Sequence, residues 1–277
     1  MRVITSKKII NTVADLCRQA AYILPADIIK ELKTAKQKEK GLTQKILELT
    51  LKNAEIAKKQ VFPLCQDTGT AVLFIELGQN AKIEGPLETA LQNGIKKGFK
   101  ENYLRKSIVI DPLFNRQNTK TNTPAIIHYK IVKGDKLKIN LLLKGGGAEN
   151  KSQIKMFNPT ASKHEIIDFI VSVAKNAGAS ACPPFIIGVG LGGNFDSAAL
   201  LSKQALLRDT PNKNKNYKKL EEEILKEINK TNIGAQGFGG KFTALKVFVE
   251  YAPCHIASLP CAVNICCHSM RRAKAVL

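Results

Sequence analysis

The hydrophobic periodicity of the chain changes near Val61, and this change constrains the fold more than any other feature. Before it, apolar residues such as Ile9 and Val13 recur at helical spacing and predict a first helix. Two further helices follow, with Pro25 in the first turn of the second and Thr43 as the cap of the third. After it, short apolar runs alternate with turn residues. We therefore predict a mixed α/β (α+β) fold, with a helical N-terminal layer packed on a mixed sheet.

The second part of the chain contains distinct predicted elements. Residues 71–77 predict a buried strand and residues 87–99 a helix. Residues 125–132 and 137–143 flank a Gly-Asp turn at 134–135 and predict a hairpin. The remaining elements are helices over 165–176, 197–207 and 220–228, and strands over 185–189 and 242–251. Because neither a repeat nor a clear linker interrupts this order, we expect one domain over residues 1–277, with residues 1–60 as the helical layer.

Composition excludes several classes of protein. A chain of 277 residues with 44% apolar residues is long enough to bury a core without disulfides. It has no apolar run near 18 residues and no secretory signal pattern, so we expect a soluble, cytoplasmic protein without a membrane span. The net charge of +20 is compatible with nucleic acid or with an anionic substrate. Nucleic acid is the less favoured partner, because the lysines are dispersed and no RNA-reading motif is present.

Seven cysteines constrain the chemistry. Their odd number, their spacing and the absence of a CxxC pair argue against a disulfide framework and against a zinc ribbon. Cys65, Cys182 and Cys267 stand in segments rich in Gly, Pro or polar residues, where catalytic groups tend to gather. Each of the three is either a buried thiol or a ligand brought into place by the fold, and spacing alone leaves both interpretations open.

Two glycine-rich segments are candidate binding loops. Gly145, Gly146 and Gly147 follow a predicted strand, and their amides could approach an anion, although a hairpin bulge explains them equally well. The segment 188–193 fits G-x-G-x-x-G. A dinucleotide site also needs a second parallel strand ending in an acidic residue, and a polar loop stands there instead. We therefore reject a dinucleotide site and expect the segment to form a pocket wall.

Five blocks stand in order along the chain: Cys65-Gln66-Asp67-Thr68-Gly69, Leu104-Arg105-Lys106-Ser107, Lys144-Gly145-Gly146-Gly147, Cys182-Pro183-Pro184, and His255-Ile256-Ala257 with Cys267. Together they resemble the class I iron–sulfur fumarate hydratases, and in particular the α subunit of the two-subunit form. The related tartrate dehydratase α subunit shares the cysteine blocks. Residues 145–152 and 105–113 look more like the fumarate hydratase.

The resemblance implies that Cys65, Cys182 and Cys267 hold a 4Fe–4S cluster. Three thiolates for four irons leave one iron without a protein ligand, and this iron can act on substrate as a Lewis acid. Cys267 is preferred to the adjacent Cys266 because Asn264-x-x-Cys267 matches the family's Asn-x-x-Cys. The remaining cysteines, Cys17, Cys254, Cys261 and Cys266, are then packing residues, and residues 61–277 form the cluster- and substrate-binding part.

The implied reaction is the reversible hydration of fumarate to malate, a step of the tricarboxylic acid cycle. By resemblance, the dicarboxylate substrate contacts Gln66, Asp67, Arg105, Gly147 and His255, and Asp67 and His255 are the catalytic residues. Each side chain also has a structural alternative. Asp67 suits an Asx turn, Arg105 a solvated surface charge, and His255 a structural role.

The resemblance also implies a partner. Single-chain relatives carry a further C-terminal domain, whereas this chain ends ten residues after Cys267, so a separate β subunit is expected to complete the pocket. Three alternatives remain open. They are a tartrate or related hydroxydiacid dehydratase α subunit, a basic nucleic-acid-binding protein, and a noncatalytic cluster or zinc scaffold.

Overall fold

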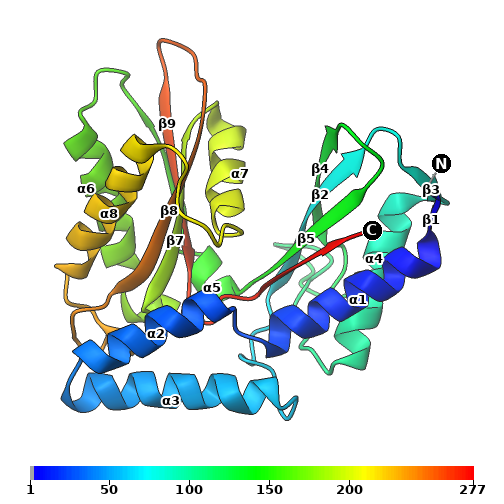
Figure 1. The fold of residues 1–277 in the computed structure, drawn as a ribbon, viewed down its shortest axis with the longest axis horizontal. Coiled ribbons are helices and arrows are strands. Elements are labelled where there is room, and N and C mark those ends of the chain that lie inside the picture. The colour runs from blue at the N-terminus through cyan, green and yellow to red at the C-terminus, as the bar shows by residue number, and fades with distance from the viewer. Residues whose placement is uncertain (1–2) are drawn as a thin grey trace. The chain divides into compact units, whose positions relative to one another are not determined.

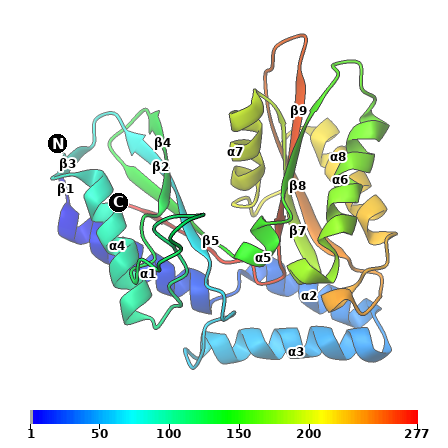
Figure 2. The ribbon, with the colours of Figure 1, turned by 180° about the vertical axis from the view of Figure 1, so that it is seen from behind.

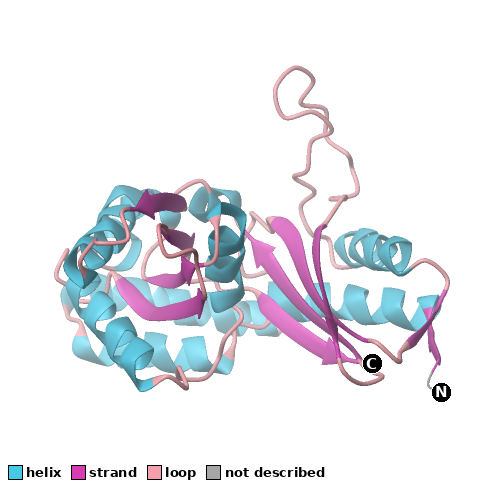
Figure 3. Ribbon diagram, turned by 90° about the horizontal axis from the view of Figure 1, so that it is seen from above, coloured by secondary structure: helices cyan, strands magenta, loops and turns pink. Residues whose placement is uncertain are grey.

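The computed structural model describes residues 3–277, which divide into two compact units (Figure 1). The first unit contains residues up to Pro25, Asn53–Gly146 and Arg271–Leu277; the second contains Ala26–Lys52 and Gly147–Met270. Each unit combines helices with a four-stranded sheet, so the predicted mixed α/β class is confirmed (Figure 3). The single domain stays a prediction. No helix within residues 3–277 is both long and apolar enough to span a bilayer.

The first unit is built on a sheet with the strand order β10-β5-β2-β4. These strands are β2 (Thr70–Gly78), β4 (Ile126–Val132), β5 (Leu137–Lys144) and β10 (Arg272–Val276), and a short pair joins β1 (Val3–Thr5) to β3 (Lys82–Glu84). Helices α1 (Ser6–Tyr22) and α4 (Leu87–Glu101) pack together beside the sheet. Gly94 and Gly98 permit this close packing, because a Cβ at either position would lie 2.5 Å from Val13 Cβ or 2.7 Å from Cys17 Cβ.

The predicted hairpin of the first unit is wrong. Both strands form, but β2 lies between them, parallel to β4 and antiparallel to β5. The short connection over residues 133–136 therefore passes across the end of β2. Gly78 makes this possible, because a Cβ there would lie 2.6 Å from the Gly134 carbonyl oxygen, and the Gly78 amide instead donates to the Lys136 carbonyl at 2.8 Å.

The second unit is built on a sheet of β6 (Gln153–Phe157), β7 (Phe185–Gly192), β8 (Ala244–Ala252) and β9 (Leu259–Cys266), in the order β6-β9-β7-β8. Helix α7 (Phe195–Ala205) lies on one face, and α6 (Lys163–Ala177) and α8 (Lys215–Asn229) lie on the other (Figures 1 and 2). Helix α3 (Gly41–Lys58) begins in this unit and ends in the first. The remaining elements are α2 (Ala26–Lys38), α5 (Gly146–Glu149) and 3-10 turns at Gly178–Ala181 and Ala235–Gly237.

The glycines of β7 serve packing, and the expectation of a pocket wall is wrong for Gly188 and Gly190. Both are buried beneath α7, and a Cβ on either would overlap a carbonyl oxygen of that helix. The absence of a Cβ at both positions lets α7 lie this close, and a reciprocal capping box between Asn194 and Ser197 fixes its first turn. Helix α6 has a capping box of the same kind, between Ser162 and Glu165.

Candidate active site

The loop that begins at Cys65 leads directly into β2 of the first unit. Cys65 and Asp67 are half-buried, Gln66 is exposed, and Thr68 and Gly69 are buried. Gly69 has φ of +77°, and a Cβ there would overlap the Lys144 carbonyl at the end of β5. Only glycine combines this backbone conformation with so close an approach. The sequence therefore fixes the loop against the start of the glycine-rich segment.

Asp67 has a carboxylate held by two backbone amides. Its Oδ1 accepts from the Gly69 amide at 3.1 Å, which is the Asx turn considered from sequence. Its Oδ2 accepts from the Gly146 amide at 2.9 Å. The glycine-rich loop thus places an amide on an anion, and in this structure that anion is the Asp67 carboxylate. These two contacts fix the orientation of the carboxylate relative to both loops.

Arg271 is a member of this arrangement to which the sequence analysis gave no role. It is only 2% exposed, and its Nη1 donates to the backbone carbonyl of Asp67. A Cβ on Gly145 would lie 2.9 Å from Arg271 Nη2 and 3.3 Å from Asp67 Oδ2, so the cation and the carboxylate flank the same glycine. Arg271 Nε has no hydrogen-bond partner in the described structure. In the sequence, Arg271 is only one of two adjacent arginines shortly after Cys267, and such a pair is typical of a charged surface.

Arg105 lies on the segment that follows α4 and is tied to the Asp67 turn through its backbone. The Thr68 hydroxyl donates to the Arg105 carbonyl at 2.7 Å. The Arg105 side chain is exposed and forms no ion pair within residues 3–277. Asn122, also missed from sequence, is fully buried and donates to the Gly69 carbonyl at 3.1 Å. The first unit therefore presents a fixed carboxylate, a buried cation and an exposed cation around one turn.

Cys182 and Cys267 lie at the same end of the sheet of the second unit. Cys182 precedes β7 with a left-handed backbone conformation (φ of 53°), and Cys267 follows β9. Because β7 and β9 are antiparallel, with Ile186 opposite Cys266, the start of one strand adjoins the end of the other. The His268 amide donates to the Cys182 carbonyl at 3.3 Å and joins the two loops directly.

Gln236 and His268 support these two cysteine loops and were not found from sequence. The backbone amide of Gln236 donates to the Pro183 carbonyl at 2.8 Å, and the side-chain Nε2 of Gln236 lies 3.0 Å from His268 Nδ1. His268 Nδ1 is also 3.1 Å from the Cys182 carbonyl. The G-A-Q-G-F-G-G run at 234–240 was the available signal, since Gln236 adopts a left-handed conformation between glycines.

The structure does not bring His255 to Cys267 within the second unit. His255 is exposed in the loop between β8 and β9, and its Nδ1 accepts from the Ala257 amide at 3.1 Å. Cys267 follows the opposite end of β9, whose seven residue steps from Leu259 to Cys266 span about 23 Å. Gly147 is exposed in α5, where a Cβ would make an ordinary 3.5 Å contact with the Ser180 carbonyl.

The cysteines differ in their environments, and Cys254, expected to be a packing residue, is instead exposed in the loop that follows β8. Cys17 and Cys261 are buried, and burial raises the pKa of both thiols, that of Cys261 to about 12. Cys266 is also buried, with its Sγ 3.4 Å from the Met270 sulfur. By contrast, the three cysteines of the predicted ligand set lie in loops and are half-buried or exposed. Accessible loop thiols suit iron–sulfur ligation, whereas buried thiols of high pKa suit packing.

The described residues do not by themselves assemble a metal site. Within residues 3–277, no group of three or more His, Cys, Asp or Glu side chains is arranged to hold a metal ion. None of the seven cysteines, all of which lie in the described range, forms a disulfide. Cys65 belongs to the first unit, and Cys182 and Cys267 belong to the second. Ligation by these three residues together is therefore a proposal.

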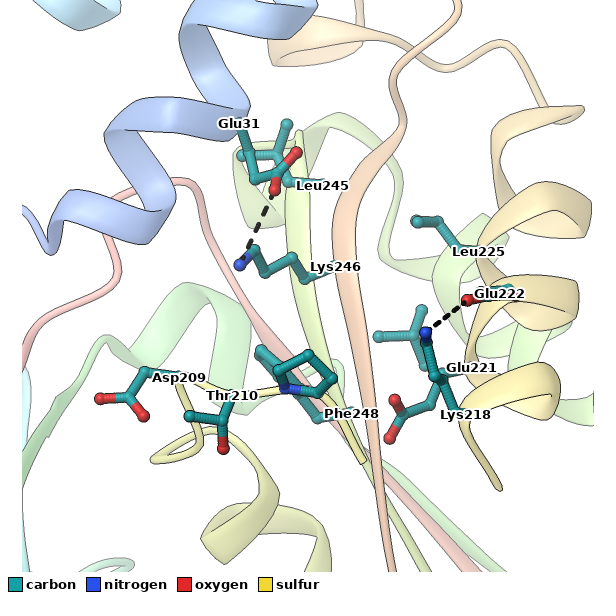
Figure 4. A pocket seen from close by; sticks show the side chains of 12 residues that line it. Glu31, Asp209, Thr210, Lys218, Glu221, Glu222, Leu225, Leu245, Lys246 and Phe248 are labelled. Carbon is teal, nitrogen blue, oxygen red and sulfur yellow. Dashed lines mark ion pairs between the residues drawn. The ribbon is translucent and has the colours of Figure 1, made fainter. Parts of the chain in front are cut away.

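A cavity of about 270 Å³ in the second unit lies between α2, α8 and β8 (Figure 4). Its charged side chains are paired, with Lys246 Nζ 3.8 Å from a Glu31 oxygen and Lys218 Nζ 4.0 Å from a Glu222 oxygen. None of the predicted site residues lines it. The cavity is thus separate from the residues described above.

Comparison with known proteins gives a consistent result. Residues 10–276 match the model of the family described as fumarate hydratase (Fumerase). The chain is 38% identical over 276 residues to a protein of Methanocaldococcus jannaschii named, provisionally, L(+)-tartrate dehydratase subunit alpha, with 96% of each chain covered. It is 28% identical over 275 residues to the L(+)-tartrate dehydratase subunit alpha of Escherichia coli K12 and to that of Shigella sonnei, covering 98% of this chain and 91% of each relative.

Proposed function

The chain belongs to the fumarate hydratase (Fumerase) family, and on that premise we propose that it is the α subunit of an iron–sulfur hydro-lyase that interconverts fumarate and malate. A separate β subunit would complete the enzyme. The observation that carries the proposal is the Asp67 carboxylate, fixed by the Gly146 amide beside the buried Arg271. This is a positioned acid/base next to a cation, on the loop that begins at Cys65.

Cys65, Cys182 and Cys267 would hold the 4Fe–4S cluster. When bound, the cluster supplies Lewis-acid chemistry at the iron that lacks a protein ligand. The donor set fits this group, because all three cysteines lie in accessible loops and the buried cysteines stand elsewhere. The hydrogen bond from His268 to the Cys182 carbonyl supports the proposal, since it holds two of the three loops together.

Binding of a dianionic substrate requires cationic and amide donors. The Arg105 guanidinium is exposed and without an ion pair in the described residues, so its planar fork can bind a substrate carboxylate in a bidentate manner. Gln66 presents an exposed amide one residue before Asp67. The backbone of Gly147 adds a surface that no side chain obstructs.

Asp67 is proposed to move the proton. In malate dehydration a proton leaves the carbon next to a carboxylate, and a positioned carboxylate accepts it; in hydration the same oxygen returns it. The amides of Gly69 and Gly146 hold this side chain in one rotamer. Replacement by asparagine removes the base and keeps one of the two hydrogen-bond acceptors, so the contact with either the Gly69 or the Gly146 amide is lost. Asp67→Asn is therefore expected to lower kcat by a factor of about 10² or more while assembly is unchanged.

His255 is proposed to donate to a substrate oxygen. Because about 23 Å of strand separates it from Cys267 in the second unit, this role requires His255 to act in the site of another copy of the chain. His255→Asn and Cys267→Ser would then each be inactive alone and regain activity when co-expressed with each other. Failure to regain activity would overturn the role.

L(+)-Tartrate is the second candidate substrate. It is favoured by the names of the relatives, each of which is called an L(+)-tartrate dehydratase subunit alpha. Both substrates are hydroxydiacids that lose water, so the same residues serve either reaction. Assays of the anaerobic complex with malate and with L(+)-tartrate, compared by kcat/KM, decide between them.

The test of the cluster is anaerobic purification with iron and sulfide analysis. Near-stoichiometric iron and sulfide, with a broad visible absorption lost in Cys65→Ser, Cys182→Ser and Cys267→Ser, is the expected result. Cys254→Ser is the matched control, because Cys254 is exposed in a loop and lies outside the proposed ligand set. A colourless wild-type chain after anaerobic reconstitution would overturn the proposal and leave nucleic-acid binding by the basic chain as the alternative.

A further inference from the structure

An arm over residues 107–122 extends from the first unit between α4 and β4. It contains neither helix nor strand and projects away from the sheet as a long loop (Figure 3). Its two sides are nonetheless joined, because Ile110 N donates to Gln117 O at 2.9 Å and Thr119 N donates to Ile108 O at 2.8 Å. The Asn118 side chain adds a 2.9 Å hydrogen bond to the Lys106 carbonyl. The arm is thus an ordered, hairpin-like element.

The tip of the arm is preorganised by one carboxylate. Asp111 Oδ1 accepts from the amides of Leu113, Phe114 and Asn115 at 2.8, 2.5 and 3.1 Å. These backbone hydrogen bonds also lower the pKa of Asp111. A turn with three amides fixed on one oxygen has little conformational freedom left to lose when it binds a partner.

The tip presents apolar side chains to solvent. Ile110 is 67% exposed, Leu113 is 71% exposed and Phe114 is 90% exposed. Apolar groups clustered on an ordered projection indicate an interaction site, because water exposure of such a patch is unfavourable and promotes aggregation unless another surface covers it. Aromatic side chains such as Phe114 are enriched in protein interfaces relative to the rest of the surface.

The root of the arm is joined to the catalytic turn. Asn122 donates to the Gly69 carbonyl at 3.1 Å and accepts from the Ser107 amide at 2.7 Å, so it joins both sides of the arm to the loop that carries Asp67. The Thr68 hydroxyl binds the Arg105 carbonyl just before the arm. A partner that binds the tip therefore acts on an element whose root holds the proposed substrate-binding arginine.

The charge of the arm identifies the chemistry of its partner. Within the arm Arg116 and Lys120 outweigh the single acid Asp111, Arg105 and Lys106 directly precede it, and the whole chain carries a net charge of +20. A second copy of this chain seated on the arm would bring like charges together at this patch, which is unfavourable at an interface. The fitting partner has an apolar groove with carboxylates at its rim.

We propose that residues 107–122 are a docking arm for the second subunit of the enzyme, whose acidic-rimmed apolar groove takes Leu113 and Phe114. This inference rests on the proposed function, because the second subunit is the β subunit of that hydro-lyase. Docking would position the root of the arm, and with it Arg105, against the Asp67 turn.

The test uses the full chain and the β subunit from the same source, with their dissociation constant measured anaerobically by biolayer interferometry in the absence of substrate. Leu113→Asp and Phe114→Asp are each expected to weaken association by roughly tenfold or more. Ile131→Asp is the matched control, because Ile131 is 73% exposed on β4 of the same unit, and it should bind within about threefold of wild type. Circular dichroism verifies that each variant is folded.

The outcomes separate the docking arm from the function. Wild-type affinity in both arm variants, or no binding of the β subunit by the wild-type chain, overturns the docking arm. A wild-type chain that dimerises, and loses dimerisation in Leu113→Asp, identifies a second copy as the occupant and also overturns it. If the α–β complex assembles through Leu113 and Phe114 but hydrates no fumarate, the proposed function is overturned and the role of the arm in docking remains.

Discussion

Gly69 offers the sharpest test of how the Asp67 turn is held. In Gly69→Ala, the new Cβ would overlap the Lys144 carbonyl and lie 2.8 Å from the Gly145 nitrogen. Ordinary Cβ contacts begin near 3.4 Å, so the backbone must move by 0.6 Å (3.4 minus 2.8) to clear the Gly145 nitrogen and further to clear the Lys144 carbonyl. Both obstructing atoms belong to the backbone at the end of β5, which cannot rotate away as a side chain can.

The expected loss of stability has two parts. Placing a Cβ at φ of +77° costs about 1 kcal/mol by itself. Moving the turn away from β5 also disturbs the hydrogen bonds at the Gly69 carbonyl and at the Gly146 amide, each worth about 1 kcal/mol. We therefore expect Gly69→Ala to reduce the free energy of unfolding by about 3 kcal/mol.

Gly41→Ala is the matched control, because Gly41 has φ of +60° and no atom within 4 Å of the position of its Cβ. It should lose only the conformational part, about 1 kcal/mol. The assay is urea unfolding followed by circular dichroism, with both variants measured beside wild type. Equal losses in the two variants would refute the reasoning, because they would show that the approach of Gly69 to β5 contributes nothing.

Three further predictions follow from other parts of the chain. Asn122→Gly keeps the left-handed backbone (φ of 60°) but removes a buried amide with two backbone partners, so urea unfolding should report a loss of about 2 kcal/mol. Hydrogen bonds from Ser162 lower the pKa of Glu165 below its usual 4.5, so the carboxylate stabilises the fold above that pH and this stabilisation is lost as the pH falls through the lowered pKa. Glu165→Gln should therefore flatten the fall in Tm between about pH 5 and pH 3. A slope equal to that of wild type would contradict the role of this cap. Burial and a raised pKa protect Cys17 and Cys261, so N-ethylmaleimide at about pH 8 should modify the exposed Cys182 and Cys254 before either of them, as peptide mass spectrometry can show.

Local patterns were sufficient for most elements but not for their pairing. The helical spacing before residue 60 and the apolar runs at 71–77 and 185–189 predict elements that the structure contains. Pairing depends on contacts between segments far apart in the sequence, which local patterns do not encode. The strands at 126–132 and 137–144 are neighbours in sequence, yet β2 occupies the place between them. In the sequence, the glycine at position 78 is the only sign of this strand order. Its role becomes clear once the connection over residues 133–136 is seen to pass across the end of β2, where a Cβ would obstruct it.

Burial explains why the candidate site was found only in part. Asp67 and Arg105 stand in recognisable sequence blocks, whereas Arg271 resembles any exposed cation until the fold encloses it. The structural alternative for Asp67 also proved compatible with a chemical role. Its Oδ1 forms the Asx turn while its Oδ2 binds the glycine-rich loop, so one carboxylate does both. A sequence pattern could not separate these roles because they use different oxygens of the same side chain.

The glycine-rich segment, the Asp67 turn and Arg271 form one interdependent arrangement. The segment has glycine at 145 because a Cβ there would meet both the Arg271 guanidinium and the Asp67 carboxylate. With that position open, the next amide reaches the carboxylate, and the arginine reaches the carbonyl of the same aspartate. Residues about 80 and 200 positions away along the chain therefore hold Asp67 from two directions, Gly146 at its carboxylate and Arg271 at its backbone carbonyl. A substitution at any of the three should disturb the same proton-transfer step, which is how a single catalytic geometry comes to depend on distant segments of the chain.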